Sequence, residues 1–96
     1  MKVVYHPSVQ RDVNGILRHY DAISTGLGDA FWDELMVLVQ AAAQSPERYR
    51  LFRSVLRRVN QRRFPYHFLF RIIPGGIRVV GVRHHRRHPD YGIERS

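Results

Sequence analysis

The chain contains no cysteine, and lysine occurs only once among its 96 residues. Without thiols there can be no disulfide framework, thiolate metal centre or cysteine nucleophile, and this absence fits a reducing compartment. No apolar run approaches the roughly 18 residues that a membrane span needs, and the first residues lack the apolar stretch of a secretory signal. These absences predict a cytoplasmic protein without a membrane partner.

Carboxylates are scarce in the second half of the chain, so its charge is unevenly distributed. Residues 1–47 carry three cations and six carboxylates, whereas residues 48–96 carry thirteen arginines and two carboxylates. With a formal net charge of +8, such a chain attracts polyanions and repels itself, so a neutralising partner would stabilise it. Arginine favours bidentate contacts to phosphate or carboxylate. The alternative interpretation is a solvated basic face with no partner.

Hydrophobic residues make up 44% of the chain, an ordinary share for a folded protein. At this length the chain can bury one hydrophobic core and is too short for two. We therefore expect a single domain over residues 1–96.

Two amphipathic helices are predicted in the first half, after a short strand at residues 2–5. Pro7 suits the first turn of a helix. Apolar residues then recur at helical spacing and form one stripe: Val9, Val13, Ile16, Leu17 and Tyr20. After a turn near residues 24–28, a second stripe has the same spacing: Phe31, Leu35, Leu38, Val39 and Ala42. Ser45-Pro46 ends the second helix, which we expect to run antiparallel to the first.

Alternation of residue types predicts three strands in the second half, after a polar connection over residues 47–54. These strands are residues 55–61, 66–73 and 77–83. In the middle strand the residues that point to one face are Tyr66, Phe68, Phe70 and Ile72. Pro74-Gly75-Gly76 predicts a hairpin, so the last two strands should pair antiparallel.

The predicted order is therefore β-α-α-β-β-β, an α+β fold. A helical hairpin with apolar stripes and a small antiparallel sheet with one apolar face can bury both surfaces by packing the helices on one side of the sheet. The opposite side of the sheet would then carry the arginines, away from the mildly acidic helices.

This element order resembles the RelE/ParE superfamily of bacterial toxins, and several strings look like its ParE or plasmid-stabilisation branch. In the first half these are the proline-led helix, the Gly28–Phe31 string and Ser45-Pro46. In the second half they are residues 62–71, which resemble the arginine, aromatic, proline, tyrosine strand of the family, and residues 79–89, which resemble its closing strand and basic tail. The resemblance implies a growth-inhibiting toxin that is held inactive by a cognate antitoxin.

Two mechanisms occur on this one fold, so the fold alone does not choose between them. ParE-like members inhibit DNA gyrase, and RelE-like members cut mRNA in the ribosome. RelE-like nucleases tend to carry a lysine-rich active centre, whereas the only lysine here is Lys2. We therefore rank gyrase inhibition first, a ribosome-dependent endoribonuclease second, and a nucleic-acid-binding module without toxin activity third.

Candidate catalytic residues, if the chain is a nuclease, are taken from its second half. RNA cleavage without a metal needs an acid, a base and cations that stabilise the phosphorane. The candidates are Arg63, Arg71, Arg83, His85 and Tyr91. For His67 we favour an exposed strand position without a catalytic role. For Tyr91 we favour a hydrophobic anchor that holds the tail to the core.

No metal or other cofactor is expected. His84, His85 and His88 have two members at i and i+4, but Pro89 opposes a helix there and the neighbouring arginines repel a dication. For the antitoxin we expect an acidic segment that contacts the arginines, with an apolar landing beside the second helix. The candidate partner-binding residues are Phe31, Trp32, Arg58, Arg62, Arg63, Arg71, Arg86 and Arg87. For Trp32 core packing is the alternative.

Overall fold

The computed structural model describes residues 1–87 and has the helix and strand order predicted from the sequence, with two additional short elements. In chain order the elements are β1 (Lys2–Tyr5), α1 (Ser8–Ile23), α2 (Leu27–Gln44), the 3-10 turn η1 (Pro46–Arg48), β2 (Leu51–Arg53), β3 (Leu56–Asn60), β4 (Tyr66–Ile73) and β5 (Gly76–His84). Both predicted helices and all three later strands are confirmed: the strand at 66–73 has the predicted bounds, and the ends of the other elements shift by up to three residues.

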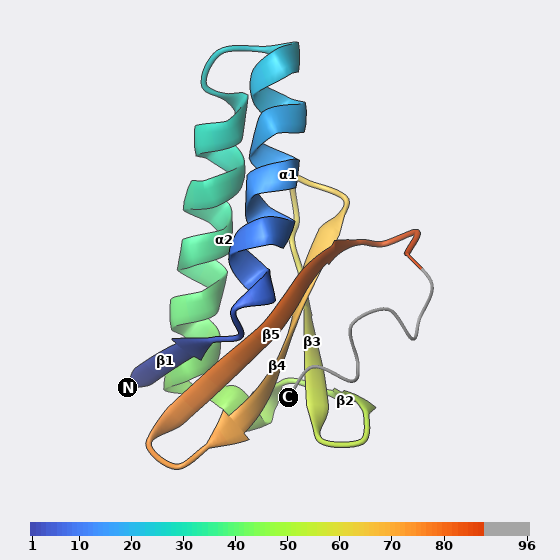
Figure 1. The fold of residues 1–96 in the computed structure, drawn as a ribbon. Coiled ribbons are helices and arrows are strands. Elements are labelled where there is room, and N and C mark those ends of the chain that lie inside the picture. The colour runs from blue at the N-terminus through green and yellow to red at the C-terminus, as the bar shows by residue number, and fades with distance from the viewer. Residues whose placement is uncertain (88–96) are drawn as a thin grey trace.

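The two helices form an antiparallel hairpin that lies against one side of the sheet (Figure 1). The chain leaves α1 at Ser24, whose extended backbone stops the helix while its N–H donates to the Tyr20 carbonyl. Gly26 then adopts a left-handed conformation, φ 84°, which favours a residue without Cβ, and α2 begins at the next residue.

The sheet has five strands in the order β1-β5-β4-β3-β2. Three neighbouring pairs are antiparallel, but β1 pairs with β5 in parallel, from Lys2 opposite Gly76 to Tyr5 opposite Val79. The sheet is therefore mixed: the antiparallel pairing predicted for the last two strands is confirmed, and the parallel pairing of β1 was not predicted. The helical hairpin separates β1 from the other strands in the chain, so no tight turn fixes the direction of β1 relative to its partner. By contrast, the glycine turn between β4 and β5 requires those two strands to be antiparallel.

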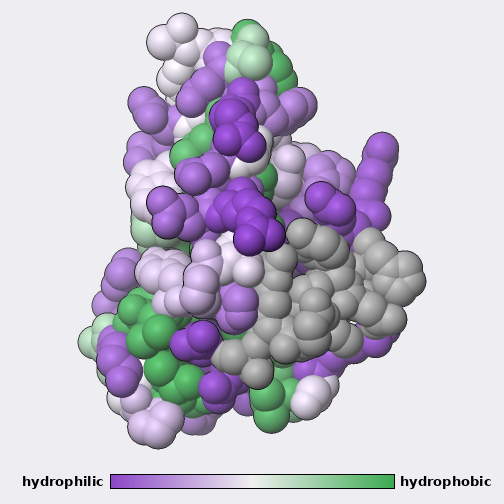
Figure 2. Space-filling view, viewed as in Figure 1, coloured by the Kyte–Doolittle hydropathy of each residue, from purple (hydrophilic) through white to green (hydrophobic). Residues whose placement is uncertain are grey.

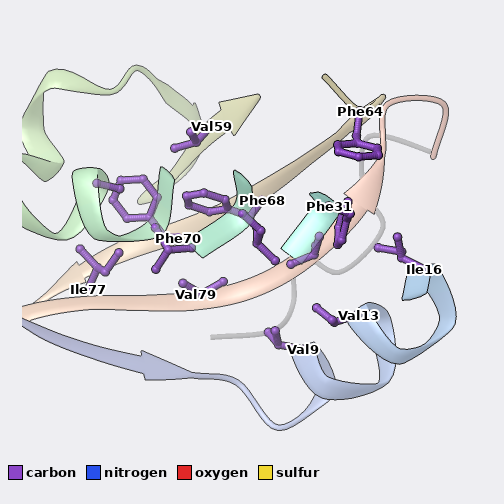
Figure 3. Close-up of a cluster of buried hydrophobic side chains, with 14 of the residues drawn as sticks. Val9, Val13, Ile16, Phe31, Val59, Phe64, Phe68, Phe70, Ile77 and Val79 are labelled. Atoms are coloured by element: carbon purple, nitrogen blue, oxygen red, sulfur yellow. The ribbon is translucent and has the colours of Figure 1, made fainter. Parts of the chain in front are cut away.

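The core lies between the helices and the sheet (Figure 3). Both helical stripes contribute to it, and the sheet adds the helix-facing side chains of β3, β4 and β5. Its buried members include Val9, Val13, Ile16, Phe31, Leu35, Val39, Val59, Phe68, Phe70, Ile77 and Val79. This packing confirms that Tyr66, Phe68 and Phe70 face the helices, although Ile72 is exposed at the strand end.

The opposite side of the sheet is here called the open face. It is formed by the side chains that alternate with the core residues: Arg58 and Asn60 from β3, His67, Leu69 and Arg71 from β4, and Arg78, Val80 and Arg83 from β5. A register shift after Leu69 places Val80 on this face together with Leu69, and Gly81 stands beside it. In the view of Figure 2, hydrophilic side chains cover most of the helical hairpin, and hydrophobic ones gather near β1 and the β4–β5 turn.

A candidate anion-binding face on the sheet

The strands carry seven cationic residues and no carboxylate. Four of the seven lie on the open face: Arg58, Arg71, Arg78 and Arg83. The segregation is incomplete, because Arg57 points to the helix side and donates from Nη1 to the Tyr49 carbonyl at 2.6 Å. The open face is nevertheless a surface of one sign, as the sequence predicted.

One end of this face holds a continuous chain of hydrogen bonds, here called the arginine–histidine cluster (Arg58, His67, Arg83 and His85). The Nε of Arg83 donates to the Nε2 of His67 at 2.7 Å. The Nδ1 atoms of His67 and His85 are 2.9 Å apart, and the Nη2 of Arg58 lies 3.3 Å from the same nitrogen of His85. Arg58, His67 and Arg83 come from three adjacent strands, and His85 directly follows β5, where its backbone N–H donates to the Pro65 carbonyl at 3.0 Å.

The two imidazole rings meet edge to edge. They are within 7° of parallel, with centroids 5.1 Å apart. The Nδ1 atoms of the two rings are 2.9 Å apart, whereas the ring centroids are 5.1 Å apart, so the two nitrogens lie between the ring centres. Stacked rings would instead lie face to face, with their planes roughly 3.5 Å apart. The rings are therefore nearly coplanar, and the shared proton lies along the line between the nitrogens.

Burial and the surrounding cations keep both histidines neutral. The pKa of His67 is lowered to about 3, first by burial and then by Arg58, Arg83, His85 and His84. The pKa of His85 is also lowered, by burial and by Arg58 and His84. His67 is only 1% exposed, so the prediction of an exposed strand residue was wrong. Burial lowers the pKa of Arg58 as well, and a guanidinium remains charged at neutral pH all the same.

Phe52 of β2 supports the cluster from one side. Its ring lies 5.1 Å from the guanidinium carbon of Arg83 and 5.7 Å from that of Arg58. Asn60 accepts a hydrogen bond from the Nε of Arg58 at 2.8 Å. The two arginines are thus held in fixed orientations, and only His85 is exposed among the four members of the cluster.

Arg71 and Arg78 form a second cationic site further along the face. They are cross-strand partners, and each has a buried Nε that makes no hydrogen bond in the described structure. Arg71 lies four residues from His67 on β4, about 13 Å at the rise of a strand. The predicted site residues Arg71 and Arg83 therefore share a face but not a contact site.

Arg62 and Arg63 lie in the loop between β3 and β4, which Glu34 of α2 holds in place. The Oε1 atom of Glu34 accepts from the backbone N–H of Arg62 at 3.2 Å and from the side chain of Gln61 at 3.1 Å. Its Oε2 accepts from the N–H of Arg63 at 3.1 Å. Both arginine side chains are exposed, and that of Arg63 stacks on Phe64 at 5.4 Å.

The two aromatic partner-binding candidates have different positions. Phe31 is fully buried in the core, so it cannot contact a partner from this position. Trp32 is 41% exposed and lines a groove of about 700 Å³ between α1, α2 and the end of β1, together with Tyr5, Leu17 and Met36. Core packing does not account for Trp32.

Arg86 and Arg87 are exposed and lie in the turn after β5, next to His85. The candidates His88 and Tyr91 lie outside the described residues. Within residues 1–87 no group of three or more histidine, aspartate or glutamate side chains could hold a metal ion, and no helix is long and apolar enough to cross a membrane.

Sequence reasoning missed the residues that connect the site. Phe52 belongs to β2, which is only three residues long and was read as connection. Glu34 could have been found from the sequence, because it lies next to Leu35 of the buried helical stripe. A carboxylate in that position points towards the loops at the edge of the sheet. The pairing of His67 with Arg83 depends on the β4–β5 register, which shifts by one residue between Leu69 and Phe70, so the hairpin turn alone does not predict it.

In the part of the chain that the structure describes, a helical hairpin covers one side of a five-stranded mixed sheet, and the strands carry seven cationic residues and no carboxylate. These features define a small α+β protein. A search of curated proteins finds none that matches the chain. The family model described as "ParE toxin of type II toxin-antitoxin system, parDE" matches residues 3–89. The chain therefore belongs to the ParE toxin family, whose members pair with an antitoxin.

Proposed function

We propose that this toxin inhibits growth by binding DNA gyrase in the cytoplasm, and that it acts by binding and not by catalysis. The observation that supports binding is the engagement of the imidazole nitrogens on the open face. Both ring nitrogens of His67 are hydrogen-bonded within the cluster, and Nδ1 of His85 is bonded as well. No free acid and base pair remains among the four side chains.

The charge of the open face also supports a protein target. Its arginines are held by Phe52, Asn60 and His67, so they are organised before any partner arrives. Preorganised guanidinium groups bind carboxylates with little loss of side-chain entropy. A carboxylate-bearing surface of gyrase fits this requirement.

A supercoiling assay tests the proposal. Purified toxin at micromolar concentration should prevent purified gyrase from supercoiling relaxed plasmid in the presence of ATP. Arg58→Glu should weaken inhibition strongly, whereas Arg18→Glu, which makes the same charge change on the exposed side of α1, should weaken it little. Unchanged supercoiling at micromolar toxin would remove gyrase as the target.

A ribosome-dependent endoribonuclease is the second candidate, and one observation favours it. His85 is exposed, neutral and next to the guanidinium of Arg58, which is a plausible environment for a phosphate. In that case ribosomes carrying a message should show cuts at the decoding site. The cuts should disappear when Arg63, Arg71 and His85 are substituted together, and a message left intact by the native toxin would exclude this function.

The antitoxin is expected to present an acidic segment to the arginines and an apolar segment to the groove beside Trp32. The exposed cations on this part of the molecule include Arg62, Arg63, Arg86 and Arg87. Trp32→Ala should weaken the toxin–antitoxin complex without changing gyrase inhibition, because the groove and the open face lie on different sides of the sheet. Titration calorimetry of the two purified proteins measures the first effect.

A further inference from the structure

The direction of each hydrogen bond in the arginine–histidine cluster follows from its first donor. A guanidinium can only donate, so the Nε2 atom of His67 accepts from Arg83 and carries no proton. Because His67 is neutral, its single proton is on Nδ1. That proton must be donated to the Nδ1 atom of His85, which lies 2.9 Å away.

The same reasoning extends one residue further. Because Nδ1 of His85 accepts a hydrogen bond from His67, it carries no proton. It therefore also accepts from the guanidinium of Arg58. A neutral imidazole has one proton, so His85 carries it on Nε2. Its partners occupy Nδ1, and the ring is exposed, so the Nε2–H group is left for a ligand.

We propose that Arg83 and His67 are positioning residues that hold His85 as a neutral imidazole, whose Nε2–H binds a carboxylate of the protein partner together with the guanidinium of Arg58. This inference rests on the proposed function, since it assumes that the open face binds a protein. It assigns His85 the part of a fixed hydrogen-bond donor and not of an acid or a base.

The aromatic content of the site favours a carboxylate over a nucleotide. Single-stranded nucleic acids usually stack their bases on free aromatic side chains. Phe52 is the aromatic residue in the small apolar cluster of the open face, and the guanidinium groups of both Arg58 and Arg83 already lie against it. A donor pair formed by one guanidinium and one N–H suits the two oxygens of a carboxylate.

Among residues 1–87, the charged and titratable groups around His85 are Arg58 from β3, His67 from β4, and His84 and Arg83 from β5. Burial, Arg58 and His84 lower the pKa of His85. A second proton on His85 would also direct a donor at the Nδ1–H of His67. The ring should therefore remain neutral until the cluster itself comes apart.

Nitrogen-15 NMR of the full-length toxin tests the assignment, because ring nitrogens with and without a proton have well separated shifts. At pH 7 the native protein should show His85 with its proton on Nε2 and His67 with its proton on Nδ1. Observation of His85 as an imidazolium, or with its proton on Nδ1, overturns the proposal. This measurement needs no gyrase, so it can fail while gyrase inhibition stands.

Two substitutions of His67 separate positioning from simple packing. His67→Asn places an amide N–H near the position of Nδ1 and should keep the proton of His85 on Nε2. His67→Gln keeps an acceptor for Arg83 but loses the donor at 2.9 Å, so Nδ1 of His85 keeps only its 3.3 Å contact with Arg58 and both tautomers of His85 should appear. The same tautomer of His85 in both variants would overturn the positioning role, and the native spectrum decides the assignment if either variant does not fold.

Two probes distinguish the class of ligand. A hexaglutamate peptide should shift the ring signals of His85 at lower concentration than a six-nucleotide uridine RNA, and His67→Gln should weaken peptide binding about two- to tenfold, the loss of one hydrogen bond. The control His19→Gln, an exposed residue of α1, should bind like the native protein. A preference of His85 for the RNA would overturn the carboxylate assignment.

Discussion

At the scale of single residues, His67 shows how position determines what an imidazole can do. In solution a histidine exchanges protons near neutral pH, but this one is buried, bonded at both nitrogens and surrounded by cations. It therefore acts as a rigid neutral connector between Arg83 and His85. His85 is the exposed member of the cluster, and its Nδ1 is hydrogen-bonded to His67.

The lowered pKa of His67 predicts a loss of stability in acid. The unfolded chain takes up a proton at the ordinary value of 6.5, whereas the folded protein does so only at about 3. Stability is therefore complete above pH 6.5 and falls as the pH decreases towards 3, by up to about 1.4 kcal/mol per pH unit. His67→Gln should lose less free energy of unfolding than the native protein between pH 7 and pH 5, as measured with urea. Parallel curves for the two proteins would contradict this prediction, and His19→Gln is the control.

Glu34 is the residue that joins α2 to the loop before β4. Its carboxylate accepts the N–H groups of Arg62 and Arg63 and the amide of Gln61. Glu34→Gln replaces one acceptor oxygen with a donor that faces the N–H of Arg63. We expect a loss of about 1–3 kcal/mol in the free energy of unfolding, because the N–H of Arg63 keeps only its longer contact, 3.3 Å to Oε1, and the remaining acceptor is no longer charged.

Hydrogen exchange measures this effect locally. In Glu34→Gln the amides of Arg62 and Arg63 should exchange faster, while the core amides of β4 keep their relative order. The exposed Glu47→Gln in η1 is the matched control and should change neither stability nor exchange. If both variants behave alike, Glu34 does not hold the loop.

At the scale of elements, the helices and strands that could be predicted from the sequence are the ones that bury one regular stripe of side chains. The stripes of α1 and α2 and the alternation of β4 and β5 are visible without coordinates, because burial on one face imposes its period on the residue types. Strand β2 has only three residues, two of them exposed, so it leaves no pattern. The parallel direction of β1 and the burial of His67 depend on contacts between distant segments, which a local pattern does not contain.

The contact of β1 with β5 predicts that replacing Gly76 with alanine destabilises the protein. A Cβ on Gly76 would collide with the backbone carbonyl of Lys2, which cannot move away without breaking the parallel pair. Gly76→Ala should therefore destabilise the protein by about 2 kcal/mol or more, in the upper range of single substitutions. Faster exchange of the His6 amide, which donates to the Val79 carbonyl at 2.8 Å, should accompany the loss.

Gly15 is the matched control for the same substitution. It lies within α1, and a Cβ there would meet no atom within 4 Å. Gly15→Ala should stabilise the protein by about 0.5–1 kcal/mol, because alanine loses less backbone entropy in a helix. A stabilising Gly76→Ala would show that β1 is not fixed against β5 in solution.

At the scale of the whole molecule, the charge distribution links stability to function. The six carboxylates of residues 1–87 all lie on the helices or in η1, and the strands have none, so the arginines of the open face repel one another without compensation from the sheet. Such a face is stabilised by an acidic partner. We therefore expect an acidic antitoxin segment to stabilise the toxin as well as to bind it.

Reversing one charge of the Arg71–Arg78 pair tests this relation. The two residues are direct cross-strand partners, and like charges in that arrangement are destabilising while opposite charges attract. Arg78→Glu should therefore raise the free energy of unfolding by about 0.5–1 kcal/mol relative to Arg18→Glu, which makes the same change in net charge on α1. The same substitution should weaken gyrase inhibition more than Arg18→Glu does, since it places a carboxylate on the open face. If Arg78→Glu is no more stable than the control, repulsion between Arg71 and Arg78 does not destabilise the toxin. If Arg78→Glu inhibits gyrase as well as the native toxin does, gyrase does not bind the open face.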